Sequence, residues 1–480
     1  MGRVETLEVL NACVNQLDLR IPQSEAFLNS VESAIQYLQE HYYQELSHSR
    51  VGSLPVTVHS IGHTHIDVAW KWTLSQTRQK AVRSFLTVSR LMKQYPEYKF
   101  MSSQPQLYQY VKESAPKLYG EIKEMVKQGR WETEGAMWLE ADCNLSSGES
   151  LIRQILYGKQ FFRQEFGTEE NEILWLPDVF GYSVALPQIL KKSGIRYFMT
   201  TKLGWNENNQ IPHDTMMWQG LDGSEILTYF ITTTNYQSYP ELNYKKTFNT
   251  TYNGLQNAKQ IMGTWQRFQD QSLSRDVLTC YGYGDGGGGP TAQMLEENRR
   301  LEQGICGCPV TKQTFTRDFF HILEHNLTGK KIPRWCGELY LEFHRGTYTS
   351  MARNKKNNRE CEFLNGDAEF FSVLAGYDGG TLSYPKKQLE EVWKLLMLNQ
   401  FHDILPGSSI KEVYQDSDLQ YARIRQIDHT IIREAQKNIV KQHGYQPATG
   451  IESNCKLAVF NTVGFERTGL VKVNEQVSIP

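Results

Sequence analysis

The chain has 480 residues, of which 40% are hydrophobic and 22% are charged, and its formal net charge is -2. This composition excludes a disordered chain and predicts about two to four globular domains. Because the two signs of charge are interspersed and nearly balanced, we expect no nucleic-acid partner and no binding to an acidic membrane surface.

The sequence predicts neither a secretory leader nor a membrane span. Residues 1–7 lack a charged start followed by an apolar run, and no stretch approaches the ~20 apolar residues that cross a bilayer. The eight Cys residues are spread without dense spacing, which is typical of reduced thiols rather than of a disulfide framework. We therefore expect a cytoplasmic protein.

Residues 1–55 show helical periodicity and no chemistry, so we interpret them as an N-terminal helical extension. From residue 56 to 320, strand-like runs alternate with amphipathic stretches. This alternation predicts an α/β domain built on a parallel sheet or barrel of about seven strands. The runs are 56–61, 99–103, 131–137, 173–177, 197–201, 226–230 and 277–281.

The pattern turns helical in residues 321–445, with long stretches at 347–375, 388–404 and 411–441. Three such stretches are enough for a three-helix bundle. Two further strand-like runs follow at 456–460 and 470–473. We therefore expect residues 453–480 to begin a β-sandwich domain that is cut off at the end of the sequence.

The segment His63-Thr-His65-Ile-Asp67 follows the first apolar run directly. Residues two apart in a strand point to the same face, so His63, His65 and Asp67 can converge on one point. Imidazole nitrogen and carboxylate oxygen are ligands that suit zinc. A chain with 12 His residues also places some of them near carboxylates by chance, so the motif alone leaves both readings open.

Two later runs also end in carboxylates. Asp178 follows the run 173–177, and Asp285 follows the run 277–281 and opens into four glycines and Pro290. In α/β enzymes the carboxyl ends of the strands carry the chemistry. No Gly-Lys-Ser/Thr follows the glycines, so a nucleotide-binding loop is not predicted, and close approach of the backbone to a ligand is favoured instead.

Two further candidates are ambiguous when taken alone. Glu338 and Glu342 share a face if their segment is a strand, but they are equally consistent with solvated surface carboxylates. His402 and Asp403 lie on an apolar helical stretch, where a His is usually a core residue rather than a ligand.

Taken together, these motifs resemble the α-mannosidases of glycoside hydrolase family 38, in their cytoplasmic and bacterial branch. They occur in order along nearly the whole chain from about residue 56. The resemblance implies a β/α barrel, a helical bundle and a large C-terminal β region, most of which this sequence lacks. The segments that carry it are His65–Asp67 with Trp70, Trp175–Tyr182, Gly284–Pro290, Gly337–Ser350 and Asn399–Asp403.

The resemblance also implies residue roles. One divalent metal ion, with zinc favoured, would be held by His65, Asp67, Asp178 and His402, with His63 outside this ligand set. Asp178 would also be the nucleophile that forms a covalent mannosyl-enzyme, which implies retention of configuration. The residues expected to contact the sugar are Trp70, Lys202 and Asp403.

The general acid is left between Asp285 and Glu338. Glu338 lies in the region that corresponds to the acid-bearing loop of better-known branches, although the register does not settle an equivalence. We rank Asp285 first, because its glycine-rich loop could hold a carboxyl near the glycosidic oxygen and burial would raise its pKa.

We therefore expect a retaining, metal-dependent α-mannosidase that acts on terminal α-linked mannose of oligosaccharides, with homo-oligomerisation left open. Two alternatives remain at this point. The first is a metal-dependent carbohydrate deacetylase, since related barrels host that chemistry with similar ligands. The second is an inactive sugar-binding fragment.

Overall fold

The computed structural model of the chain describes residues 2–44, 56–234, 250–305, 307–377, 382–445 and 458–470. The expected strand at 470–473 and most of the expected β domain at 453–480 lie outside these residues. Within 458–470 the backbone forms neither helix nor strand. No helix in the described ranges combines the length and the apolar character needed to cross a membrane.

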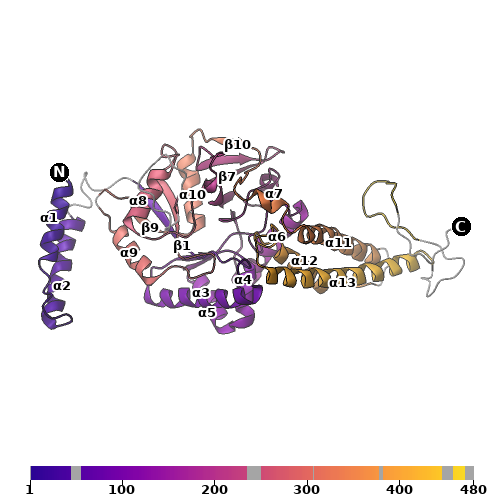
Figure 1. Cartoon of the computed structure of the whole chain (residues 1–480), viewed down its shortest axis with the longest axis horizontal. Coiled ribbons are helices and arrows are strands. Elements are labelled where there is room, and N and C mark those ends of the chain that lie inside the picture. The colour runs from indigo at the N-terminus through magenta and orange to yellow at the C-terminus, as the bar shows by residue number, and fades with distance from the viewer. Residues whose placement is uncertain are drawn as a thin grey trace.

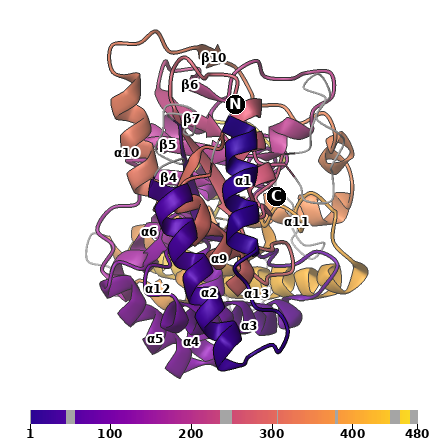
Figure 2. The ribbon, with the colours of Figure 1, turned by 90° about the vertical axis from the view of Figure 1, so that its left-hand side faces the viewer.

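The N-terminal segment contains the helices α1 (Gly2–Val14) and α2 (Glu25–Leu38), followed by a π-helical turn at Gln39–Gln44. The hydroxyl of Ser24 begins α2 by accepting a hydrogen bond from the backbone N–H of Phe27. The two helices lie at one end of the molecule (Figure 1), and Figure 2 views the molecule from that end. The helical periodicity of residues 1–55 thus corresponds to two helices.

The first sheet is parallel and has β1 at its centre. In it β1 pairs with β2, β8 and β9, and β2 pairs with β3. Parallel strands that are covered on both faces are buried along their length. Six of the seven residues of β1 are buried, among them the polar residues His59 and Ser60. The strands are β1 (Thr57–His63), β2 (Phe100–Ser102), β3 (Trp131–Thr133), β8 (Asp276–Tyr281) and β9 (Val310–Gln313).

The second sheet has the order β10-β6-β7-β5-β4 and contains one antiparallel pair, β6 with β7. A tight turn joins that pair, with the N–H of Gly220 donating to the carbonyl of Ser224. A single parallel bridge, Gly135 with Leu174, links the segment after β3 to β4. The strands are β4 (Ile173–Trp175), β5 (Tyr197–Thr200), β6 (Thr215–Gln219), β7 (Glu225–Phe230) and β10 (Arg334–Cys336).

All seven predicted runs contain a strand, and the mixed α/β class with parallel pairing is confirmed. The single parallel barrel is not confirmed, because the described strands divide into two sheets. The expectation that every pair is parallel was wrong for β6 and β7. A β hairpin needs only a short turn, and Asp222-Gly223 between these strands was a turn signal in the sequence.

Helices cover both sheets and bury their apolar stripes against them. The helix α3 begins with a reciprocal capping box between Thr73 and Gln76 and packs Phe85 and Val88 into the core. In Figure 1, α3 and α5 lie below the sheets. The helices of this region are α3 (Leu74–Gln94), α4 (Pro105–Ser114), α5 (Pro116–Lys127), α6 (Gly148–Phe166), α7 (Leu186–Lys192), α8 (Ala258–Arg267), α9 (Ala292–Glu302) and α10 (Thr316–Leu327).

Three long helices, α11 (Ala352–Gly376), α12 (Lys386–Asn399) and α13 (Lys411–Gln442), extend side by side away from the sheets (Figure 1). They bury a common cluster that includes Trp393, Leu396 and Tyr421. The helix α12 ends at Asn399, before the predicted boundary at 404. The chain turns back to the sheets there, with Phe401 bridging Ala141.

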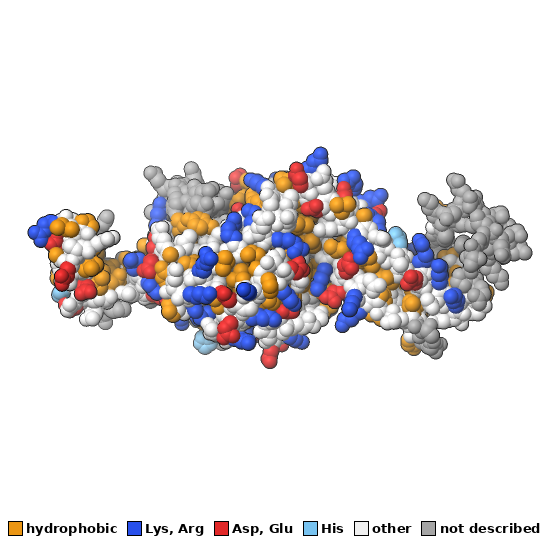
Figure 3. Space-filling view, turned by 90° about the horizontal axis from the view of Figure 1, so that it is seen from below, with side chains coloured by type: hydrophobic (Ala, Val, Ile, Leu, Met, Phe, Trp, Pro, Cys, Tyr) orange, Lys and Arg blue, Asp and Glu red, His pale blue; other side chains and the backbone are white. Residues whose placement is uncertain are grey.

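On the face seen in Figure 3, basic and acidic side chains are intermixed over the body of the molecule. No large field of one sign gathers on that face. This distribution agrees with the balance of 51 Lys and Arg against 53 Asp and Glu in the sequence.

Candidate active site

The candidate site lies where the chain leaves the C-terminal end of β1. Strand β1 ends at His63, and the next residues continue beside the glycine-rich loop, with Ile66 bridging Gly286. The N–H of Asp67 donates to the carbonyl of Asp285 over 2.8 Å. The local backbone therefore brings the ends of β1 and β8 together.

Glycine at position 282 is what allows this approach. Gly282 has φ 128°, and a Cβ there would lie 2.2 Å from the carbonyl oxygen of His63. Any other residue would therefore clash with the chain of β1. The sequence predicted close backbone approach to a ligand at the glycines after Asp285, and Gly282 makes a separate close approach to the protein's own first strand.

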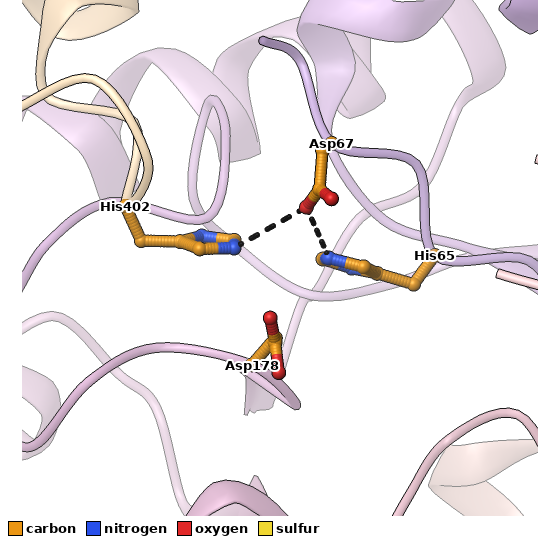
Figure 4. A group of neighbouring side chains, drawn as sticks. All are labelled: His65, Asp67, Asp178 and His402. Carbon is orange, nitrogen blue, oxygen red and sulfur yellow. Dashed lines mark hydrogen bonds and ion pairs between the residues drawn. The ribbon is translucent and has the colours of Figure 1, made fainter. Parts of the chain in front are cut away.

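Four side chains from three parts of the chain converge in Figure 4. His65 and Asp67 follow β1, Asp178 follows β4, and His402 follows α12. Their ligand-type atoms all lie within 4.8 Å of one another. Oδ1 of Asp67 lies 2.9 Å from Nε2 of His65 and 3.6 Å from Nε2 of His402. Two nitrogen and two oxygen donors arranged in this way suit a divalent cation.

The orientation of His402 supports this fit. Its Nδ1 lies 2.7 Å from the backbone carbonyl of Glu140, so Nδ1 carries the proton and Nε2 presents its lone pair. Nε2 is buried and has no hydrogen-bond partner in the described part of the chain. A buried polar atom without a partner is costly, and a cation at the centre of the group would satisfy it.

The electrostatics of the group also suit a cation. Burial alone would raise the pKa of Asp67, but the charge of His65, the hydrogen bond from His65 and the charge of His402 lower it to about 2. Burial would lower the pKa of His65, yet the charges of Glu140 and Asp67 raise it well above its ordinary value. Asp67 is therefore ionised at neutral pH.

Asp178 is positioned by a buried lysine. Nζ of Lys202 donates to Oδ1 of Asp178 over 2.7 Å, and only 4% of Lys202 is exposed. The ammonium group also lies 4.1 Å from the ring centroid of Trp205. Lys202 therefore balances the charge of this carboxylate and fixes its orientation.

Asp285 occupies a backbone conformation that is rare for residues other than glycine, with φ 56°. Its Oδ1 accepts a hydrogen bond from the Tyr252 hydroxyl over 2.6 Å. Burial, followed by the negative charges of Asp67 and Asp178, raises the pKa of Asp285. A carboxyl that holds its proton more tightly is suited to acid catalysis.

A pocket of about 210 Å³ opens over these residues. Six of the residues predicted from the sequence line it: Asp67, Trp70, Asp178, Lys202, Asp285 and Asp403. Aromatic rings from Phe180, Trp205 and Tyr252 complete the wall and offer flat apolar faces of the kind that pack on sugar rings. A larger hollow of about 350 Å³ shares Thr250 with this pocket but contains none of the predicted residues.

Glu338 does not reach this pocket. Its side chain is exposed and lines a different surface hollow with Tyr340 and Tyr348. The carboxylate of Glu342 accepts hydrogen bonds from the backbone N–H groups of residues 207–209 instead. The structure therefore brings Asp285, and not Glu338, together with Asp178.

His63 lies outside the group, although the alternation of a strand predicted that it could converge with His65 and Asp67. Regular strand geometry ends at His63, so the alternation does not continue to the later two residues. The His63 ring packs 5.5 Å from the Trp175 ring, and burial lowers its pKa to about 3.

Several contacting residues were missed in the sequence, among them Glu140, Tyr252 and His344. Glu140 lies just beyond the predicted strand 131–137, so the rule that found Asp178 could also have found it. Tyr252 follows no strand and carried no comparable signal, whereas His344 lies within the segment Gly337–Ser350 that carries the resemblance but was given no role.

Comparisons with known proteins agree along the chain. Residues 55–338 match the model of the glycosyl hydrolases family 38 N-terminal domain, and residues 342–439 match the alpha mannosidase middle domain. Human alpha-mannosidase 2C1 is 40% identical over 79% of this chain and 34% of its own length. An alpha-mannosidase of Saccharomyces cerevisiae is 35% identical over 94% of this chain and 40% of its own length.

The chain thus spans about a third to two fifths of the length of these relatives. The crystal structure of an alpha-mannosidase from Enterococcus faecalis V583 superimposes with a TM-score of 0.65 at 17% identity. That alignment covers 80% of this chain and 43% of the bacterial chain. At this identity the likeness supports the fold alone.

Proposed function

Because the chain belongs to glycoside hydrolase family 38, we propose that it carries the active site of a retaining, metal-dependent α-mannosidase that removes terminal α-linked mannose from oligosaccharides. The observation that carries this proposal is the convergence of His65, Asp67, Asp178 and His402 beside a pocket that also contains Asp285. The relatives named as alpha-mannosidases support the substrate class.

In this proposal His65, Asp67, Asp178 and His402 hold one divalent ion. When bound, the ion, for which zinc suits the mixed nitrogen and oxygen donors, would hold and polarise hydroxyl groups of the sugar. The free Nε2 of His402 and the ionised Asp67 support the assignment.

Asp178 is the proposed nucleophile. Its carboxylate oxygen attacks the anomeric carbon while the bond to the glycosidic oxygen breaks, and the leaving oxygen takes a proton from Asp285. Water then attacks the mannosyl-enzyme, gives a proton back to Asp285 and releases Asp178. Two displacements restore the original configuration. The ammonium group of Lys202 holds Asp178 in place for the attack.

The remaining wall of the pocket orients the sugar. Trp70 offers an aromatic face, and Asp403 offers a carboxylate whose position is set by a hydrogen bond from the Ser408 hydroxyl. We propose that Trp70 stacks on the ring and that Asp403 accepts a hydrogen bond from one of its hydroxyl groups.

The expected domain boundary at residue 320 falls within α10, and β10 beyond it pairs with β6 of the second sheet. We therefore propose that the catalytic unit extends from residue 56 through β10, that α11, α12 and α13 form a three-helix bundle domain, and that residues 1–55 are a helical extension. The bridge between Gly135 and Leu174 supports a continuous catalytic unit. The common core of α11, α12 and α13 supports the bundle.

The proposal as a whole is tested by metal analysis coupled to an assay of the 480-residue chain on an aryl α-mannoside. We expect one bound ion per chain and hydrolysis that is lost with the metal. Metal binding without hydrolysis would favour the sugar-binding alternative, and cleavage of an acetylated sugar instead would favour a deacetylase.

Replacement of Asp285 by alanine should separate substrates by their leaving groups. An acid matters most when the leaving group is poor, so kcat/KM should fall on the order of 10²- to 10⁴-fold for a mannose disaccharide and far less for a nitrophenyl mannoside. Added azide should replace the activated water and yield mannosyl azide of retained configuration. Both effects can be followed by product analysis and proton NMR.

Glu338→Ala is the matched control for this experiment, because Glu338 is exposed and lines a separate hollow. We expect kinetics near those of the wild type. Leaving-group dependence and azide rescue in Glu338→Ala, together with an equal loss on all substrates in Asp285→Ala, would reverse the assignment and leave Asp285 as a residue that positions the substrate.

A further inference from the structure

We propose that Glu140 orients both histidine ligands toward the metal. Its carboxylate contacts Nδ1 of His65, and its backbone carbonyl accepts a hydrogen bond from Nδ1 of His402. This inference rests on the metal site of the proposed function. Glu140 is itself buried, with 1% of its surface exposed, and does not line the pocket. It is therefore a positioning residue and not a catalytic one.

The His65 ring is held between two carboxylates. Its Nδ1 lies 3.0 Å from Oε2 of Glu140, and its Nε2 lies 2.9 Å from Oδ1 of Asp67. A neutral imidazole carries its proton on one nitrogen, and a carboxylate beside Nδ1 favours the proton there. With the proton on Nδ1, Nε2 would be free to donate its lone pair to a bound cation, and the carboxylate beside Nδ1 would make it a stronger donor.

The same residue controls His402 through its main chain. The carbonyl oxygen of Glu140 lies 2.7 Å from Nδ1 of His402 and also accepts the backbone N–H of His402 over 3.2 Å. Next to this contact, Ala141 bridges Phe401, and the N–H of Asp142 donates to the carbonyl of Gln400. These contacts with the segment around Glu140 end α12 at Asn399 and fix the orientation of the His402 ring.

Glu140 is in turn held by two buried neighbours. The Ser103 hydroxyl donates to Oε1 of Glu140 over 3.0 Å, and the side-chain oxygen of Gln104 accepts the N–H of Glu140 over 3.3 Å. The side-chain amide of Gln104 also donates to the carbonyl of Ile66, the residue between the ligands His65 and Asp67. The backbone of Gln104 itself has φ 62°. A left-handed residue other than glycine at this point indicates a constraint imposed by its surroundings.

A purely structural role would also explain a buried carboxylate, because a buried charge must be paired to be tolerated. Glu134 provides the comparison. It is fully buried directly after β3, six residues before Glu140, but its carboxylate faces the N–H of Gly135 and the guanidinium of Arg317 instead of a histidine. Only Glu140 is expected to affect the metal.

The test measures the metal affinity of the metal-free 480-residue chain by competition with a chelator. We expect Glu140→Gln, which keeps the shape but removes the charge, to weaken zinc binding about 10-fold, and Glu140→Ala to weaken it up to about 100-fold. With cobalt(II) in place of zinc, the visible absorption bands should shift in Glu140→Gln, because the histidine geometry changes. Glu134→Gln should keep wild-type affinity and bands even if its melting temperature falls.

Affinity within twofold of wild type in Glu140→Gln, or an equal loss in Glu134→Gln, would overturn the inference. If neither Glu140 variant folds, Ser103→Ala decides, since a weaker site supports the inference and an unchanged one refutes it. Failure of the wild-type chain to bind zinc or cobalt would instead refute the metal site itself, and this inference with it.

Discussion

Asp178→Ala is expected to lower kcat for an aryl α-mannoside on the order of 10⁴-fold or more, because the change removes the proposed nucleophile and one of the four proposed metal ligands together. It also leaves the buried ammonium group of Lys202 without its carboxylate. We expect none of the other pocket carboxylates to replace Asp178 as nucleophile, because each is held at a different position, after another strand or helix. The measurement is steady-state hydrolysis with the metal in excess.

Covalent trapping identifies the nucleophile independently of the loss of activity. A fluorinated mannosyl reagent should label the wild-type chain on the peptide containing Trp175–Tyr182 and should not label Asp178→Ala. Mass spectrometry of the digested protein locates the label. Labelling of another carboxylate, or product of inverted configuration by proton NMR, would exclude the double role of Asp178.

His402→Ala should weaken metal binding by more than the roughly 10- to 100-fold that is typical of residues that only orient a ligand. The change removes the buried Nε2 that has no hydrogen-bond partner among the described residues. A metal that binds only the folded state raises its stability, by about 2.7 kcal/mol at a concentration 100 times Kd. The melting temperature of wild type should therefore rise with added zinc, while that of His402→Ala should rise little at the same concentration.

His63→Ala is the matched control, since His63 is equally buried and two residues from a ligand but stays outside the group of four. We expect a lower melting temperature for this variant and an undiminished response to zinc. Stoichiometric metal in His402→Ala after dialysis against a chelator would count against the ligand assignment.

The positions of the main site residues were within reach of the sequence because each follows a strongly apolar run. His65 and Asp285 come just after β1 and β8, which are paired parallel strands of the first sheet. Asp178 comes just after β4 of the second sheet, which the bridge between Gly135 and Leu174 joins to the first. The three long helices were equally visible, because the tendency of a stretch to form a helix is a local property of the sequence. Helices α11 and α13 begin or end within a few residues of the predicted stretches.

Other features depended on hydrogen bonds between segments far apart in the chain. The sequence predicted helix to residue 404, but α12 ends at Asn399 because the next residues pair with the segment around Glu140. Apolar periodicity cannot report such a contact, since its two partners are more than 250 residues apart. The contact between Glu140 and His402 was hidden for the same reason.

The choice of general acid between Asp285 and Glu338 also depended on contacts that the sequence does not report. Both are carboxylates near strands, and residue type and spacing alone ranked Asp285 only slightly ahead. The path of the backbone separates them, because the glycine-rich loop bridges the segment that follows β1 and carries Asp285 into the pocket, whereas Glu338 is exposed elsewhere. The sequence by itself identified candidate residues at the strand ends, and long-range pairing in the tertiary structure decided which of them face one another.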